Sequence, residues 1–145
     1  MLTASKNPKA VTDKLSKEYT LKGVGPPEYY LGDDIERIVE PEKALTMGSG
    51  TYIDKCLTIY EQLFGGLPPN KIYTSLDAKD HPELGMSKNL DKAGMQLYWK
   101  LLGMLQWAVT MGKIKIMCVT MTMGGFRAQP RQEHMNRLKQ IYGFF

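Results

Sequence analysis

The apolar residues of four segments recur three and four positions apart, which is the period of an α-helix. These segments span residues 8–19, 49–64, 91–110 and 132–142. Side chains at that spacing share one face of a helix, so each segment predicts an amphipathic helix whose apolar face points inward. The 91–110 segment has the clearest repeat, which runs through Met95, Tyr98, Leu101 or Leu102, Leu105 and Val109.

The residues at the ends of these segments strengthen the helix predictions. Asn7 followed by Pro8 suits the start of the first helix, and Ser49 and Asp91 are candidate N-caps for the second and third. A Gly-Gly pair follows residue 64 and favours termination of the second helix there. We therefore expect helix boundaries close to these positions.

A different pattern, rich in tyrosine and isoleucine and without a helix cap, occupies residues 28–39. We interpret it as one strand that contains Gly32, where another molecule could approach the backbone closely. Residues 40–43 include a proline suited to a turn, and residues 44–47 then return as a second arm. The sequence thus predicts a β-hairpin whose tip lies at 40–43 and not at Gly32.

Two further segments complete the expected fold. Residues 67–88 are crowded with proline, aspartate and glycine, which predicts a long surface loop. Residues 114–123 mix isoleucine, methionine, valine and threonine and fit either a strand or a helix. Together these elements predict an α+β fold in which a β-hairpin leads into a mainly helical segment.

Charge changes this picture only locally. The chain has 145 residues, the size of one domain, and a net charge of +4. Residues 113–139 hold six Lys or Arg and one acid, a net of +5, whereas the remaining residues sum to −1. This basic segment is a candidate contact for a polyanion.

The sulfur-containing residues are expected in the core. Cys56 and Cys118 lie in apolar segments without metal-like spacing to another Cys or His, which predicts reduced, buried thiols in an intracellular protein. The N-terminal residues lack an apolar stretch of signal-peptide length, and two lysines interrupt the most apolar stretch, so neither secretion nor a membrane span is expected. The methionines expected to fill core gaps are Met104, Met111, Met117, Met121 and Met123.

Several short motifs occur in an order that is similar to one known family. Residues 23–32 read Gly-Val-Gly-Pro-Pro-Glu-Tyr-Tyr-Leu-Gly, and Asp34-Ile-Glu-Arg37 follows. The set resembles the polyproteins of copia-type retrotransposons and covers nearly the whole chain. Its later members are Thr51-Tyr-Ile53, Leu76-Asp77, Tyr98 with Leu101-Leu-Gly103, Gly112-Lys-Ile-Lys-Ile116, and Phe126-Arg-Ala-Gln-Pro-Arg131 with His134 and Leu138-Lys139.

The resemblance implies the last part of a reverse transcriptase. Residues 1–47 would be the end of the palm with a primer-grip-like hairpin, residues 48–90 a thumb-like helix and long loop, and residues 91–145 a helical thumb or connection segment that leads towards ribonuclease H. Lys115, in place of an acid, and Gly124-Gly125, in place of a serine-containing pair, depart from the family pattern. Such a segment, cut from its polymerase, would expose apolar surface and fold weakly or aggregate on its own.

The polymerase signature Tyr-x-Asp-Asp would lie upstream of Met1 in this family, and the ribonuclease H carboxylates would lie beyond Phe145. Gly32-Asp33-Asp34 is similar to a metal-binding triplet, but adjacent strand residues point to opposite faces, and two carboxylates alone do not hold a metal pair. We therefore expect no catalytic residue, metal or cofactor in this chain, with Mg²⁺ belonging to the intact polymerase.

Two groups of residues are candidates for nucleic-acid contact. By resemblance, Tyr30, Leu31 and Gly32 belong to the primer grip, although the tyrosines would equally suit a core. Arg127 and Arg131 are four residues apart, and His134 and Arg137 follow in helical spacing, so these cations are expected to share one helix face. Two interpretations of such a face are open: it contacts the phosphates of a nucleic acid, or it is an exposed charged face that has no partner.

The expected function is that of a reverse-transcriptase segment that positions an RNA or DNA primer–template within its parent polyprotein and has no polymerase activity alone. Neither a membrane nor a small-molecule substrate is expected as a partner. The alternative is an independent small nucleic-acid-binding or interaction protein that uses the basic segment 113–139.

Overall fold

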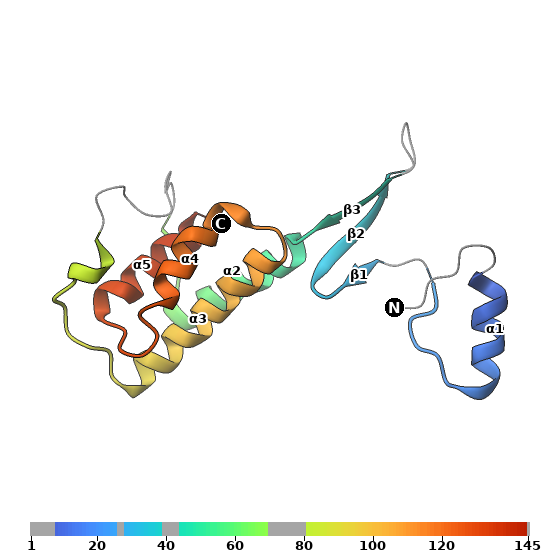
Figure 1. Ribbon diagram of the computed structural model, residues 1–145, viewed down its shortest axis with the longest axis horizontal. Coiled ribbons are helices and arrows are strands. Elements are labelled where there is room, and N and C mark those ends of the chain that lie inside the picture. The colour runs from blue at the N-terminus through green and yellow to red at the C-terminus, as the bar shows by residue number, and fades with distance from the viewer. Residues whose placement is uncertain (1–7, 26–27, 39–43, 70–80, 145) are drawn as a thin grey trace.

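The computed structural model describes residues 8–25, 28–38, 44–69 and 81–144, and within them the fold is mixed α+β, as predicted. Figure 1 shows a group of helices at one end and an antiparallel ribbon that projects from it. No helix within these ranges combines the length and apolar character needed to cross a membrane. The elements in chain order are α1 (Pro8–Glu18), β1 (Tyr29–Tyr30), β2 (Asp33–Ile38), β3 (Ala44–Gly48), α2 (Gly50–Phe64), η1 (Pro82–Leu84), α3 (Lys92–Thr110), η2 (Ile114–Ile116), α4 (Met117–Gly124) and α5 (Gln132–Gly143).

Helix α3 is the centre of the helical group. It buries Tyr98, Leu101, Leu102 and Leu105 completely, which confirms most of the inner face predicted from the apolar repeat. Helices α2, α4 and α5 pack around it, and each is joined to it by a tyrosine hydroxyl that donates to a backbone carbonyl. The three bonds run from Tyr52 to Met104 (3.0 Å), from Tyr98 to Met123 (2.7 Å) and from Tyr142 to Leu101 (3.0 Å).

The ends of the two longest helices differ in how they are capped. At α3 the predicted cap is confirmed, because the Asp91 carboxylate accepts a hydrogen bond from the Gly94 N–H at 2.8 Å. At α2, Ser49 holds the N-cap position but makes no side-chain cap bond. Instead, the carboxylate of Asp34 in β2 caps α2, because its Oδ2 accepts a hydrogen bond from the Thr51 N–H at 2.9 Å.

The sheet corrects the strand prediction for residues 28–39. The chain reverses at Leu31-Gly32. Strands β1 and β2 therefore form a hairpin with a two-residue turn, and Tyr30 pairs with Asp33 across it. Strand β2 then pairs antiparallel with β3, which confirms the return arm, and the strand order is β1-β2-β3. Gly32 therefore lies at a hairpin tip, whereas the turn predicted at residues 40–43 falls outside the described residues.

The segment 114–123, whose pattern fits either a strand or a helix, is helical as η2 and α4. Helix α4 has no charged residue and no single apolar face, and it packs only partly, so three residues predicted for the core are exposed. These are Cys118, Met117 (45% exposed) and Met121 (66% exposed). Cys56 does lie in the core, where burial raises the pKa of its thiol.

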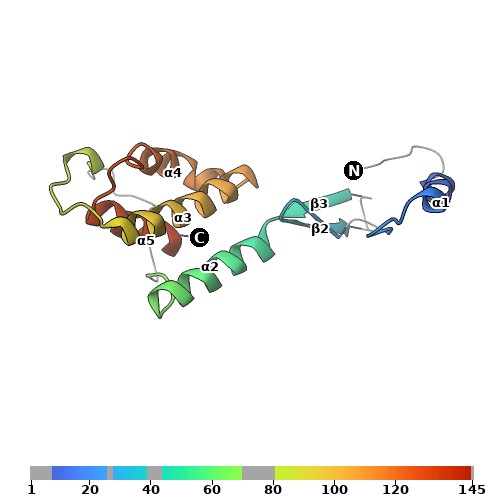
Figure 2. The same cartoon turned by 90° about the horizontal axis from the view of Figure 1, so that it is seen from below.

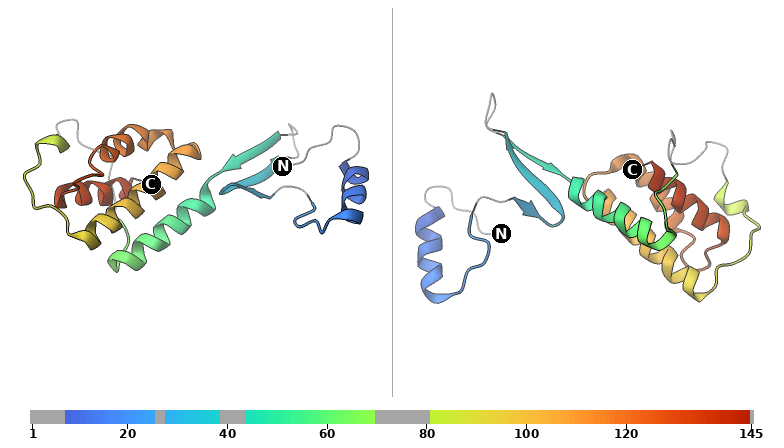
Figure 3. Two further views of the ribbon diagram at one scale, coloured as in Figure 1. Left: turned by 60° about the horizontal axis from the view of Figure 1, so that its bottom comes forward. Right: turned by 180° about the vertical axis from the view of Figure 1, so that it is seen from behind.

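Helix α1 forms as predicted, but its apolar stripe does not point into a core. Val11 is 42% exposed, and Tyr19, just after the helix, is 67% exposed. The views in Figures 1, 2 and 3 agree that α1 stands apart from the helical group, beyond the sheet. The amphipathic pattern therefore predicts the helix correctly but wrongly predicts that its apolar side chains are buried.

Removal of residues 1–25 is expected to leave the thermal unfolding of the remaining chain unchanged to within about 2 °C, because α1 shares little buried surface with α2–α5. Unfolding followed by circular dichroism at 222 nm checks this. A fall in Tm of several degrees would show that α1 stabilises the helical group.

Tyr98 predicts a loss of stability at alkaline pH. Burial raises the pKa of its hydroxyl from 10.0 to about 12. Between these values the unfolded chain has released the proton and the folded chain has not, so the free energy of unfolding falls as pH rises through this range. Tyr98→Phe should cost about 1 kcal/mol at neutral pH and make the alkaline fall less steep. Chemical unfolding at several pH values measures both; an equally steep fall in the variant would contradict the assignment.

Candidate nucleic-acid interface

The tip of the β1–β2 hairpin has an unusual residue in a demanding conformation. Leu31 has φ 54° and Gly32 has φ 109°, and two-residue turns of type I′ require positive φ at both positions. Asparagine and glycine are the ordinary residues there, whereas a leucine is strained. The Leu31 side chain is also 66% exposed, and the neighbouring tyrosines are exposed at 49% (Tyr29) and 41% (Tyr30). Within the described residues these tyrosines are therefore not part of the core.

Gly32 holds this tip against the end of α3. A Cβ on Gly32 would lie 2.9 Å from Met111 Cε and 3.3 Å from Trp107 Nε1. A Cβ at this position would have to displace the end of the Met111 side chain, and glycine takes the positive φ without strain. The end of α3 therefore makes a close approach to Gly32 through Met111 and Trp107.

A second set of contacts fixes the hairpin to α2. The Thr51 N–H donates to the Asp34 carboxylate, and this bond lowers the pKa of Asp34. The Lys55 ammonium lies 5.4 Å from the centre of the Tyr29 ring. The hairpin tip is therefore anchored where α2 begins and α3 ends.

These contacts also decide what Asp33 and Asp34 do. Asp34 caps α2, while Asp33 Oδ1 is buried without a hydrogen-bond partner among the described residues. The described residues contain no group of three or more His, Cys, Asp or Glu side chains placed to hold a metal ion. The Gly-Asp-Asp triplet is thus a turn followed by a helix cap.

The predicted cationic helix face does not form. Helix α5 begins at Gln132, so Arg127 and Arg131 both precede it. Arg131 Nη1 donates to the Ser87 carbonyl at 2.9 Å, and Arg137 Nη1 lies 3.6 Å from a Glu133 carboxylate oxygen. Of these three arginines, Arg127 is the exposed one. The helical spacing fails as a guide because a turn, and not a helix, joins residues 125 and 131.

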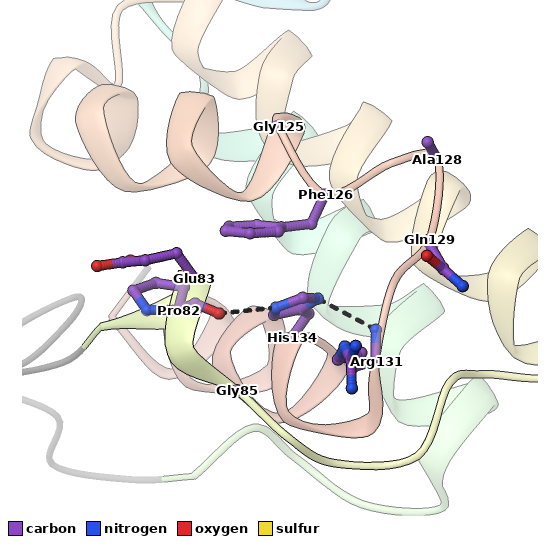
Figure 4. A pocket seen from close by; sticks show the side chains of 9 residues that line it. All are labelled: Pro82, Glu83, Gly85, Gly125, Phe126, Ala128, Gln129, Arg131 and His134. Carbon is purple, nitrogen blue, oxygen red and sulfur yellow. Dashed lines mark hydrogen bonds between the residues drawn. The ribbon is translucent and has the colours of Figure 1, made fainter.

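His134 is buried, at 3% exposure, under the ring of Phe126, and the two ring centroids are 4.1 Å apart. Its Nδ1 accepts from the Arg131 N–H and its Nε2 donates to the Pro82 carbonyl, both at 3.1 Å. Figure 4 shows these bonds beside a pocket of about 270 Å³ that Glu83 and Gln129 also line. Because both ring nitrogens are engaged, His134 joins η1 to α5 and is not a ligand for a metal.

The structure also brings forward two residues that the sequence pattern did not single out. Trp99 and Trp107 are half-exposed on the outward face of α3. Trp107 borders Gly32 at the hairpin tip, and Trp99 Nε1 donates to the backbone carbonyl of Arg127 at 2.9 Å. The signal was their spacing of eight residues, which places them on one face of a helix whose other face is the core.

Gly32→Ala is expected to lower the free energy of unfolding by about 2 kcal/mol, because the new Cβ meets Met111 and the residue must keep a positive φ. The control Gly66→Ala introduces a methyl group into open space. That control should change stability by less than about 0.5 kcal/mol. Urea unfolding followed by circular dichroism compares them, and equal effects would contradict the seating of Gly32 on α3.

Comparison with known proteins identifies no family for this chain. No family model, curated protein or solved structure matches it. The similarity to copia-type polyproteins therefore rests on the residues quoted for it, and the function that it implies is a proposal.

Proposed function

We propose that this chain is the thumb-side segment of a copia-type reverse transcriptase, where it positions a primer–template and does not itself catalyse polymerisation. In this proposal the β1–β2 tip contacts the nucleic acid through Tyr30 and Leu31. Gly32 acts indirectly, since it seats the tip on α3. Arg127 contributes a phosphate contact, while Arg131 and Arg137 stabilise the fold.

Leu31 is the observation that carries the proposal. A strained backbone and a large exposed apolar side chain both reduce the stability of a chain, and Leu31 combines them at one hairpin tip. Such a residue benefits the fold little, which favours a role in contact with another molecule. Two half-exposed tyrosines precede it, and tyrosine rings pack well on sugars and bases.

The ribbon behind the tip supports the same role. In β3, Leu45 and Met47 are each 60% exposed, so the ribbon offers apolar surface in addition to the tip. The ribbon passes directly into α2, and Asp34 of β2 caps that helix. The hairpin is therefore held in a fixed position relative to the helical group. A segment that positions the end of a nucleic acid requires such a fixed contact.

Replacement of Leu31 separates binding from folding. Leu31→Asn places a residue suited to positive φ at the turn, so we expect a higher Tm together with roughly tenfold weaker binding of a recessed primer–template in low salt. Fluorescence anisotropy with a labelled primer–template measures the affinity. The matched control is Leu84→Asn, at a leucine that is 71% exposed on η1 and far along the chain from the hairpin.

Two results would contradict the proposal. Binding by Leu31→Asn equal to that of the parent chain would remove the hairpin tip from the interface. Binding that is lost only when Lys113 and Lys115 are replaced would favour the alternative of an independent protein that uses its basic segment. The DNA that precedes this reading frame gives a separate test, since the proposal expects in-frame codons for Tyr-x-Asp-Asp there.

A further inference from the structure

The outward face of α3 carries a second candidate contact surface, formed by Trp99, Gly103 and Trp107. These residues are four positions apart and so lie on one side of the helix, opposite the buried side chains. Trp99 is 43% exposed and Trp107 is 42% exposed. A Cβ on Gly103 would meet nothing within 4 Å. We call this surface the tryptophan face; the Cα atoms of its two tryptophans are separated along the helix axis by about 12 Å.

Trp99 donates to the Arg127 carbonyl and Trp107 borders Gly32, but these contacts leave both indoles half-exposed and do not require a glycine at position 103. Apart from proline, glycine is the least favourable residue for a helix interior, and at Gly103 no neighbouring atom excludes an alanine. Tryptophan has the largest side chain, and both copies are open to solvent on a helix that buries four other large residues. A molecule that approaches the helix closely at Gly103 and packs on both indoles accounts for all three positions.

The tryptophan face joins two sites that are far apart in the sequence. At one end, the Trp107 indole nitrogen lies 3.3 Å from the position that a Gly32 Cβ would take, beside Leu31 at the hairpin tip. At the other end, the Trp99 indole N–H is held by the carbonyl of Arg127, whose side chain is exposed. The tryptophan face therefore contacts the hairpin tip at one end and the backbone of Arg127 at the other.

Charge indicates which kind of molecule would lie along this face. Helix α3 contains Lys92 and Lys100, both exposed, and no aspartate or glutamate. A polyanion with flat apolar groups suits both the lysines and the indoles. We propose that the tryptophan face binds a single nucleic-acid strand, with unpaired bases stacked on Trp99 and Trp107 and the backbone closest to the helix at Gly103. This inference rests on the proposed function and extends its site from the hairpin to α3.

Trp99 and Trp107 are the two tryptophans of the whole sequence, so tryptophan fluorescence, excited where tyrosine does not absorb, reports on this face alone. Titration of the full chain in low salt with an oligodeoxythymidylate should quench that fluorescence. A blunt DNA duplex of equal length, which offers no unpaired bases, should quench it less and bind more weakly.

The decisive variant is Gly103→Leu. Leucine favours a helix and enters open space, so Tm should equal or exceed that of the parent chain. Its side chain should keep the strand away from the helix and weaken oligonucleotide binding roughly tenfold, the scale of one lost base stack. Trp99→Ala and Trp107→Ala should each weaken binding to a similar extent. The control Thr58→Leu adds the same side chain on an exposed position of α2 and should leave binding unchanged.

Each other outcome has a defined meaning. If Gly103→Leu binds as the parent does while Leu31→Asn binds weakly, the tryptophan face is not a contact and the proposed function stands. If the parent chain binds the recessed primer–template but no single strand in low salt, the tryptophan face is not a strand-binding site and the proposed function stands; if it binds neither, both proposals fail. If the fluorescence depends on protein concentration without oligonucleotide and Gly103→Leu removes that dependence, the face joins copies of the chain and the inference is overturned.

Discussion

The three tyrosine hydroxyl bonds that join α3 to its neighbours are the constraint on which the rest of the structure depends. A buried phenol costs free energy unless its hydroxyl finds a partner, so Tyr52, Tyr98 and Tyr142 each fix the relative position of two helices as well as filling space. Apolar packing alone would tolerate sliding of one helix along another. These bonds give α3 one position among α2, α4 and α5.

That position determines where the sheet lies. The end of α3 presents Trp107 and Met111 to Gly32, and the start of α2 presents the Thr51 N–H to Asp34. Both contacts fall within a few residues of the hairpin tip, so the tip is held even though the ribbon behind it is exposed. The tryptophan face then contacts the tip through Trp107 and the Arg127 backbone through Trp99, although these features come from three separate parts of the sequence.

Sequence patterns predicted the elements that local forces specify. Helix α3 was predicted closely because its apolar repeat is long and Asp91 caps it, and α5 because Met135, Leu138 and Ile141 share a face. The turn at Leu31-Gly32 was missed because leucine is not a type I′ residue, and only contact with α3 makes the turn favourable.

The failures at the candidate site have the same origin in long-range contacts. The spacing of Arg127 and Arg131 suggested a helix, but the Arg131 side chain donates a hydrogen bond to the carbonyl of Ser87, which lies 44 positions earlier in the chain. The stripe on α1 predicted a helix correctly, yet no pattern within one helix specifies whether a partner exists to cover it. Conversely, the spacing of the two tryptophans places them on one side of a helix, but it does not by itself specify that this side is exposed. The burial of the opposite side of α3 specifies that.

The seating of the hairpin tip on α3 is tested most directly by nuclear Overhauser contacts in a chain labelled at its methionine methyl groups. We expect a contact between the Met111 methyl protons and the Gly32 α protons, which requires no substitution. Absence of this contact, in spectra that retain the contacts between buried side chains of α3 and α5, would contradict the seating of the hairpin tip on α3.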